Sequence, residues 1–374
     1  MGMIPVFRPS YDEREIEALR ETLASGWLGS GPKTKRFEEA FAGFVGTPHA
    51  LAVSSATAAL HLAFVACRVE GAEVITTPLT FVSTNHTILQ AGATPVFADV
   101  EADTLNIDPA DVERKVTERT RAIAVVHYGG HSCDMDALLA IAEGHDLALI
   151  EDCAHACGGK YRERLLGSLG RHGCFSFQAV KNLATGDGGM VVTSDAEALA
   201  RMRRLSWLGI SRDTWARVGS KGYSWEYGVD ELGFKYQMND IAATLGLVQL
   251  EKLPETNRRR RDLAERYSRL MSDFDWLELP VEKPYAHSSW HNYVVKVADP
   301  ADRDPLIKFL AERGISTGMH YIPNHLYKLY EPFRGPALPV AESVWHRLIT
   351  LPLFPDLGGD EQDHIVASIA AYRG

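Results

Sequence analysis

Short apolar segments rich in β-branched residues alternate with segments of helical periodicity between about residue 36 and residue 210. Strands are predicted at 50–53, 73–76, 95–99, 122–127, 148–151, 174–177 and 189–193. Helices are predicted at 56–68, 82–92, 135–143 and 196–205. This alternation predicts an α/β fold in which a mainly parallel sheet is covered by helices on both faces. Ligands of such sheets bind beyond the carboxyl ends of the strands.

The alternation stops after residue 210. Residues 211–233 are rich in Gly, Trp and Tyr and have no clear period, which indicates a long functional loop. A helix is predicted at 240–253, and the basic run 258–261 begins another helix and forms its solvated side. A strand at 291–298 and a helix at 304–313, ended by Gly314, follow. We therefore predict a large domain of residues 12–253 and a smaller α+β domain of residues 254–374, joined by residues 1–11.

Composition and charge narrow the class of protein. Of the 374 residues, 45% are hydrophobic and 24% are charged, which is typical of a globular protein with a sizeable core. The formal net charge of −10 disfavours a nucleic-acid binder, which presents a basic face. An odd number of cysteines and a start that does not resemble a signal peptide favour reduced thiols in the cytoplasm. No apolar stretch approaches the length of a membrane span.

Two groups of polar residues follow predicted strands in the first half of the chain. The run 54–57 (SSAT) leads into a helix, where small residues let backbone N–H groups approach a phosphate. Taken alone, the run is better explained as a plain N-cap. Asp152 ends an apolar strand and needs a partner there, such as a protonated pyridine nitrogen; capping of the next turn is the alternative. His155 is expected to bond a cofactor's ring hydroxyl or simply to pack. Cys153, His155 and Cys157 give only a weak indication of a metal site, and none is predicted.

Lys181 follows an aromatic-rich buried strand. A buried lysine has a lowered pKa and can form a Schiff base and move protons; a surface lysine in a loop is the alternative. Ser176, just upstream, could reach the same phosphate. The glycine-rich run 185–189 allows tight turns but matches neither a P-loop nor a dinucleotide fingerprint, which disfavours ATP and NAD enzymes. The motifs of zinc peptidases and serine hydrolases are also missing.

The order of four features resembles that of fold-type I pyridoxal-phosphate enzymes. These features are the run 54–57 as a phosphate-binding loop, Asp152 as the partner of a ring nitrogen, Ser176 as a phosphate ligand, and Lys181. Longer motifs carry a more specific resemblance: SGWLGSGP, SSATAALHLA, TPLTFVSTNHTILQAGATPVFADV, IEDCAHACGG, FSFQAVKNLATGDGGMVVT, GFKYQMNDIAATLGLVQLEKL and LPLFPDL. In this order, and over essentially the whole chain, they resemble the DegT/DnrJ/EryC1/StrS family of sugar aminotransferases. The resemblance implies a fold like that of aspartate aminotransferase, with a mainly parallel seven-stranded sheet and a smaller C-terminal domain.

The resemblance also implies a cofactor, pyridoxal 5'-phosphate (PLP), and its site. Lys181 would form the Schiff base and Asp152 would pair with the pyridine nitrogen, so these two are the predicted catalytic residues. Phe81 would stack on the cofactor ring and His155 would lie near its hydroxyl. The residues expected to hold the phosphate are Ala56, Thr57 and Ser176.

Family members are homodimers with two active sites at the interface. Lys235 and Gln237 would reach the cofactor of the neighbouring subunit, although many relatives have Asn where this chain has Lys235. The motifs GFKYQMND, WHNYVVKV, GISTGMHYIP and LITLPLFPD most resemble the branch that makes UDP-4-amino-4-deoxy-L-arabinose. Some relatives of that branch act on dTDP-4-keto-6-deoxyhexoses. Candidates for the nucleotide-sugar channel are Gly29, Lys33, Trp207, Arg212, His320 and Tyr321; for Lys33 and Arg212 a surface or packing role is an equal alternative.

The resemblance and the residues that carry it imply a transamination. The chain is expected to move an amino group from L-glutamate to a UDP- or dTDP-linked 4-keto sugar by ping-pong transamination, with release of 2-oxoglutarate. A 3-keto sugar is the alternative substrate. Some family members are dehydratases with His in place of the lysine, and Lys181 opposes that alternative. A regulator that binds DNA is opposed by the acidic charge and by the lack of a helix-turn-helix signal.

Overall fold

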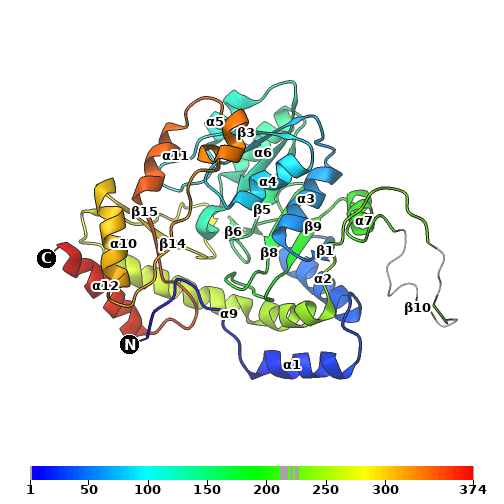
Figure 1. The fold of residues 1–374 in the computed structure, drawn as a ribbon, viewed down its shortest axis with the longest axis horizontal. Coiled ribbons are helices and arrows are strands. Elements are labelled where there is room, and N and C mark those ends of the chain that lie inside the picture. The colour runs from blue at the N-terminus through cyan, green and yellow to red at the C-terminus, as the bar shows by residue number, and fades with distance from the viewer. Residues whose placement is uncertain (1, 211–217, 220–221, 224–226, 374) are drawn as a thin grey trace.

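The structure is a computed structural model that describes residues 2–210, 218–219, 222–223 and 227–373. Its centre is a seven-stranded sheet (Figure 1) with the spatial order β1 (His49–Val53), β9 (Gly189–Thr193), β8 (His172–Ser176), β5 (Ala148–Asp152), β4 (Thr120–Val126), β2 (Glu73–Thr76) and β3 (Thr94–Phe97). Strand β9 runs antiparallel to both of its neighbours, and all other pairs in this sheet are parallel. The predicted fold class is confirmed.

Helices cover both faces of the sheet, as predicted. One face packs against α2 (Pro32–Val45), α5 (Pro109–Lys115), α6 (Met135–Gly144) and the first part of α9 (Asp240–Leu270); the other packs against α3 (Ala56–Ala66), α4 (Val82–Gln90) and α7 (Ala196–Leu205). In β4, Ile123 and Val125 join the first set, whereas Ala122 and Ala124 join the second. Successive side chains of a strand point to opposite faces, so a strand buried on both sides is apolar at every position.

Helix α9 is one continuous helix of 31 residues, so the prediction of two separate helices here is wrong. Pro254 lies inside it and removes one backbone donor. Packing on both sides of the proline offsets that loss, because Leu253 belongs to the core beneath the sheet and Tyr267 to the C-terminal core. The run 258–261 is also not wholly solvated: Arg260 is buried and donates to the carbonyl of Leu353 at 2.9 Å.

The C-terminal region has its own core, beside the far end of α9 (Figure 1). Strands β12 (Leu277–Glu278), β14 (Tyr293–Val297) and β15 (Leu348–Leu351) form an antiparallel sheet that packs with α10 (Arg303–Ala311) and α12 (Gly359–Arg373). Ile4 lies in the same core, and its N–H donates to the carbonyl of Gly314 at 2.8 Å. Because α9 runs through residues 253 and 254, the domain boundary placed there stays a prediction.

Short elements complete the described chain. Helix α1 (Glu13–Ala24) lies along α9, and α11 (Pro339–Val344) packs near the β3 edge of the sheet. The others are β6 (Lys160–Tyr161), β7 (Arg164–Leu165), β10 (Val218–Gly219), β11 (Gly222–Tyr223), β13 (Ala286–His287), η1 (Tyr128–Gly130), η2 (Pro300–Asp302), η3 (Asn324–Leu326), η4 (Lys328–Phe333) and η5 (Trp345–Arg347). Among the described residues, none of the helices combines the length and the apolar character that crossing a membrane requires.

The packing of α9 on α2 gives a testable expectation. A Cβ at Gly246 of α9 would come within 2.6 Å of the fully buried ring of Phe37, so Gly246→Ala should lower stability by about 1–3 kcal/mol through overpacking. Gly43→Ala on α2 is the matched control, since nothing lies within 4 Å of its Cβ position; it should be neutral or stabilising by up to about 1 kcal/mol. Thermal unfolding followed by circular dichroism measures both, and equal midpoints would contradict this account.

Candidate active site

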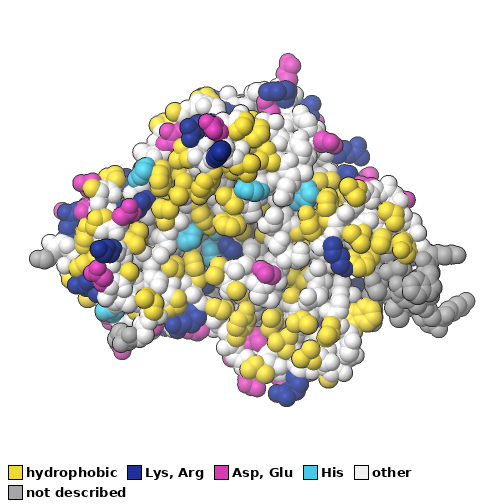
Figure 2. Space-filling view, viewed as in Figure 1, with side chains coloured by type: hydrophobic (Ala, Val, Ile, Leu, Met, Phe, Trp, Pro, Cys, Tyr) yellow, Lys and Arg dark blue, Asp and Glu magenta, His cyan; other side chains and the backbone are white. Residues whose placement is uncertain are grey.

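A cavity of about 580 Å³ opens where β4, β5 and β8 end, as expected for a sheet of this kind. The last residues of these strands, Val126, Asp152 and Ser176, lie in its wall. Figure 2 shows this side of the molecule, with histidine side chains and a cationic side chain near its middle among hydrophobic ones. The structure brings nine of the predicted site residues together here: Ala56, Thr57, Phe81, Asp152, His155, Ser176, Lys181, His320 and Tyr321.

Asp152 is a buried carboxylate with two fixed donors. Its Oδ2 accepts a hydrogen bond from the hydroxyl of Thr84 at 2.8 Å, and its Oδ1 accepts one from the N–H of Ala154 at 3.0 Å. Burial raises the pKa of Asp152, and the two donors act against this rise because they favour the ionised form. The Thr84 hydroxyl lies 2.9 Å from that of Thr80. The carboxylate is therefore oriented before any ligand binds.

Lys181 enters the same cavity from the loop that follows β8. Its backbone N–H donates to the carbonyl of Gln178 at 2.8 Å, which closes a tight turn. Burial lowers the pKa of Lys181 from 10.5 to about 8, and the charge of Asp152 acts in the opposite direction. Its Nζ lies 3.5 Å from Nε2 of His291. An amine with such a pKa is available in its neutral, nucleophilic form near neutral pH.

The N-terminus of α3 forms the other end of the cavity. Ser55 caps this helix and accepts a hydrogen bond from the N–H of Ala58 at 3.1 Å, so the N-cap role holds. Strand β9 passes close by: a Cβ at Gly189 would lie 2.4 Å from the carbonyl carbon of Ser55, so only glycine fits there. A helix N-terminus is a site for an anion. Ala56, Thr57 and Ser176 line the cavity beside it, in position for a phosphate.

His155 is neutral and has a defined tautomer. Its Nδ1 accepts a hydrogen bond from the N–H of Gly129 at 3.4 Å, so the proton lies on Nε2, which is 3.0 Å from the hydroxyl of Tyr321. Burial lowers the pKa of His155 well below its ordinary value. The rings of His155 and Tyr321 are stacked with centroids 6.0 Å apart, and that of Phe81 lies 6.3 Å from Tyr321. These rings form the aromatic wall of the cavity.

Other predicted residues lie elsewhere. Gly29, Trp207, Lys235 and Gln237 line a second pocket of about 320 Å³, where Nζ of Lys235 is 3.2 Å from the ring centroid of Trp207. Lys33 belongs to the lining of neither pocket; its Nζ lies 3.8 Å from a carboxylate oxygen of Glu21. The structure therefore separates these residues from Lys181 within one chain. The remaining candidate, Arg212, lies outside the described residues.

Sequence reasoning assigned no role to several residues of the cavity region, and two of these contact the predicted catalytic residues. Thr84 and His291 both occur in motifs quoted above, TFVSTNH and WHNY, but received no role. For Thr84 a signal exists, since it lies one helical turn after Thr80, at the start of α4. No local signal marks His291, which reaches Lys181 only because β14 lies beside the cavity.

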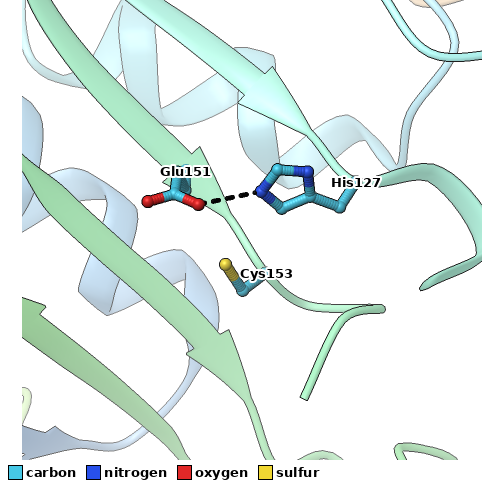
Figure 3. Close-up of side chains that lie close together, drawn as sticks. All are labelled: His127, Glu151 and Cys153. Atoms are coloured by element: carbon cyan, nitrogen blue, oxygen red, sulfur yellow. Dashed lines mark hydrogen bonds and ion pairs between the residues drawn. The ribbon is translucent and has the colours of Figure 1, made fainter. Parts of the chain in front are cut away.

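Three side chains at and near the end of β5 could in principle bind a metal ion. Among the described residues, one group of three potential ligands lies close together: His127, Glu151 and Cys153 (Figure 3); His155 and Cys157 are not part of it. Glu151 already accepts hydrogen bonds from Nε2 of His127 at 3.0 Å and from three backbone N–H groups, those of Gly167, Leu169 and Gly170. Burial raises the pKa of the Cys153 thiol well above its ordinary value. Hydrogen bonding within the protein thus accounts for the pairing of His127 with Glu151, and burial keeps the Cys153 thiol protonated.

Comparison with known proteins identifies the family. The sequence model of the DegT/DnrJ/EryC1/StrS aminotransferase family matches residues 9–370. This chain belongs to that family. The spore coat polysaccharide biosynthesis protein SpsC of Bacillus subtilis (strain 168) is 44% identical to this family member, over 98% of this chain and 96% of its own length.

Solved structures agree with this assignment. The Streptococcus pneumoniae protein Spr1654 superposes on this family member with a TM-score of 0.92 in its PMP form, at 32% identity and with 98% of each chain covered. Its PLP form gives 0.91 at 32% identity, with 99% of this chain and 98% of that chain covered. The sugar aminotransferase CalS13 of Micromonospora echinospora gives 0.90 at 33% identity, covering 99% of this chain and 100% of its own.

The chain is thus a PLP-dependent sugar aminotransferase of fold type I. The cavity fits this cofactor. It offers a helix N-terminus for the phosphate, an oriented buried carboxylate that suits a ring cation, and an amine with a lowered pKa for the aldehyde.

The lowered pKa of Lys181 predicts the pH dependence of cofactor uptake. Only the neutral amine adds to an aldehyde, so the rate of covalent PLP capture by cofactor-free protein should rise with pH and level off above about 8. Stopped-flow absorbance measures this rate, and Lys181→Arg is the control that should not capture PLP. A midpoint near 10.5, the ordinary value for lysine, would contradict this account of burial.

Proposed function

We propose that this aminotransferase moves an amino group from L-glutamate to a nucleotide-linked 4-keto sugar, in a cytoplasmic pathway of amino-sugar biosynthesis. One observation supports this above all: Lys181, with its lowered pKa, and the buried carboxylate Asp152 follow the neighbouring strands β8 and β5 and line one cavity. The pair combines a proton carrier with a fixed anion, which is what transamination demands of the protein.

The roles follow from the positions of the side chains. Bound PLP supplies an aldehyde carbon that carries the amino group and a ring that accepts electron density. Asp152 would keep a positive charge on the ring nitrogen. Nζ of Lys181 would remove the proton from Cα of L-glutamate and, in the second half-reaction, deliver a proton to C4 of the sugar. Ala56, Thr57 and Ser176 would bind the phosphate, with Phe81 and His155 beside the ring.

The proposed sugar substrate is supported by the relatives, by two residues of the cavity and by the motifs. SpsC bears a name from polysaccharide biosynthesis and CalS13 is a sugar aminotransferase, which favours a sugar as amino acceptor here. His320 and Tyr321 line the cavity and would contact that sugar. The motifs most resemble the L-arabinose branch, so a UDP-4-keto pentose and a dTDP-4-keto-6-deoxyhexose are both candidate substrates.

A panel of keto sugars tests the proposal. Purified protein with PLP and L-glutamate should aminate at least one UDP- or dTDP-linked 4-keto sugar, with one 2-oxoglutarate formed for each amine. Lys181→Arg should lower turnover at least about 100-fold, because proton transfer then lacks its carrier. Mass spectrometry of the products decides: turnover of 3-keto sugars alone, or full activity of Lys181→Arg, would contradict it.

We also propose that the active site is shared between two subunits. Lys235 and Gln237 line a pocket other than the one around Lys181, which suits residues that serve a partner's cofactor. Exposed apolar side chains occur in the same region, among them Leu28, Leu208, Val229 and Leu232. A second copy of the chain would cover them, which is favourable for a contiguous apolar surface.

Hybrid dimers, purified with two different tags, distinguish shared from separate sites. A hybrid of a Lys181→Arg chain with a Lys235→Ala, Gln237→Ala chain has one complete site if sites are shared, and should retain about half of the wild-type turnover. In the control, one chain carries all three changes and its partner is wild type. Shared sites make this second hybrid the weaker of the two. The opposite ranking, or a monomer in analytical ultracentrifugation, would overturn the proposal.

A further inference from the structure

The contact between Lys181 and His291 has no part in the roles assigned above. His291 lies two residues before β14 in the C-terminal region, and the residue is 2% exposed. Its Nε2 lies 3.5 Å from Nζ of Lys181. The other ring nitrogen, Nδ1, lies 3.2 Å from Oδ1 of Asn182, the residue after Lys181. The imidazole therefore lies between two consecutive residues of the lysine loop, and the direction of its hydrogen bonds determines what it offers to the lysine.

A chain of amides fixes that direction. The side-chain amide of Asn257 donates to the carbonyl of Cys157 at 2.9 Å, so its Oδ1 is the acceptor that faces Asn182. Nδ2 of Asn182 then donates both of its protons, to Oδ1 of Asn257 and to the carbonyl of Ser289, each at 2.8 Å. Only Oδ1 of Asn182 remains for His291. Nδ1 of His291 must therefore carry the proton and donate it.

The consequence for Lys181 is a lone pair aimed at its amine. A neutral imidazole with its proton on Nδ1 can only accept at Nε2. Burial and the nearby charge of Lys181 lower the pKa of His291 well below its ordinary value, so the ring stays neutral. Phe7 stacks on it with centroids 5.3 Å apart and planes within 3°, and His155 lies at 4.5 Å on centroids. The ring has little freedom to turn away.

We propose that His291 is a positioning residue for Lys181: its Nε2 accepts a hydrogen bond from the free amine and fixes the direction of that amine during turnover. This deepens the proposed function, on which it rests, because it concerns the same lysine in the intervals when it is not bound to the cofactor. One N–H is held by His291, so the lone pair of the neutral amine is directed elsewhere. A residue that fixes a reacting group to within about 1 Å can change rates by about 100-fold.

Substitutions at His291 separate its two contacts. His291→Gln keeps an acceptor at about the position of Nε2, facing Lys181, but loses the donor to Asn182. His291→Asn is shorter and does the reverse. His291→Phe keeps a flat ring beside Phe7 and loses both hydrogen bonds. If His291 acts only by packing, the three variants should affect Lys181 according to their size and shape. If His291 acts by accepting a hydrogen bond from the amine, only His291→Gln should preserve the behaviour of Lys181.

The readout is the pH dependence of Lys181 reactivity in the full-length, cofactor-free protein. Trace acetylation with acetic anhydride, quantified by mass spectrometry of the Lys181 peptide, gives the titration midpoint of this amine. An acceptor stabilises the ammonium form, so its loss in His291→Phe and His291→Asn should move the midpoint to lower pH by about 0.5 to 1. His291→Gln should keep the wild-type midpoint. Acetylation of Lys35, an exposed lysine, serves as a control for any general change in the reactivity of acetic anhydride.

Two results would overturn the inference: unchanged midpoints in all three variants, or a shift in His291→Gln equal to that in His291→Asn. If His291→Phe does not fold, as judged by thermal unfolding, the comparison of Gln with Asn still decides. The measurement needs neither sugar nor cofactor. If none of the keto sugars is aminated but the midpoints shift as expected, the proposed substrate is rejected and the role of His291 stands. If a 4-keto sugar is aminated but the midpoints do not shift, only the role of His291 is rejected.

Discussion

Two consecutive carboxylates end strand β5 and point to opposite sides of the sheet, and the architecture of the site depends on them. The Glu151 side chain points away from the cavity. Its carboxylate accepts hydrogen bonds from His127, in the loop after β4, and from backbone N–H groups of the segment 167–170 that leads into β8. Asp152 turns into the cavity, where Thr84 of α4 holds it. Because side chains alternate along a strand, a shift of one residue would exchange their roles. One carboxylate thus fixes the register that presents the other.

The C-terminal region is tied to the lysine loop by polar contacts as well as by packing. Asn257 of α9, Asn182 of the loop and His291 before β14 form one series of hydrogen bonds. Arg260, also of α9, is buried and donates to the carbonyl of Leu353. Burial lowers its pKa to about 10, which still leaves it charged at neutral pH. Buried polar groups are costly unless they are paired, so these bonds favour a single arrangement of the two regions.

The sequence was most informative where one physical cause acts locally. Strands β2 and β9 have the predicted bounds, because a strand buried on both faces is apolar throughout and ends at polar or small residues. Asp152 was recognisable because a charge at the end of a buried strand needs a partner. Lys181 was recognisable only together with Asp152, Ser176 and the run 54–57, whose order resembles that of the family. Helix α9 was misjudged, since Pro254 breaks the local pattern while packing on both sides maintains the helix. His291 could not be found, because its proximity to Lys181 is set by packing between distant segments.

The antiparallel strand β9 has a consequence for the lysine that the parallel strands could not provide. A parallel connection would have carried the chain across a face of the sheet, back to the amino-terminal ends of the strands. Here residues 177–188 instead form a closed loop, pinned at both ends by the pairing of Ser176 with Gly189. The lysine stays at the carboxyl ends of the strands on a short loop, and the length of that loop limits how far its amine can reach. Insertion or loss of a residue in this loop would alter the chemistry while leaving the register of the sheet intact, so evolution can adjust reaction and scaffold separately.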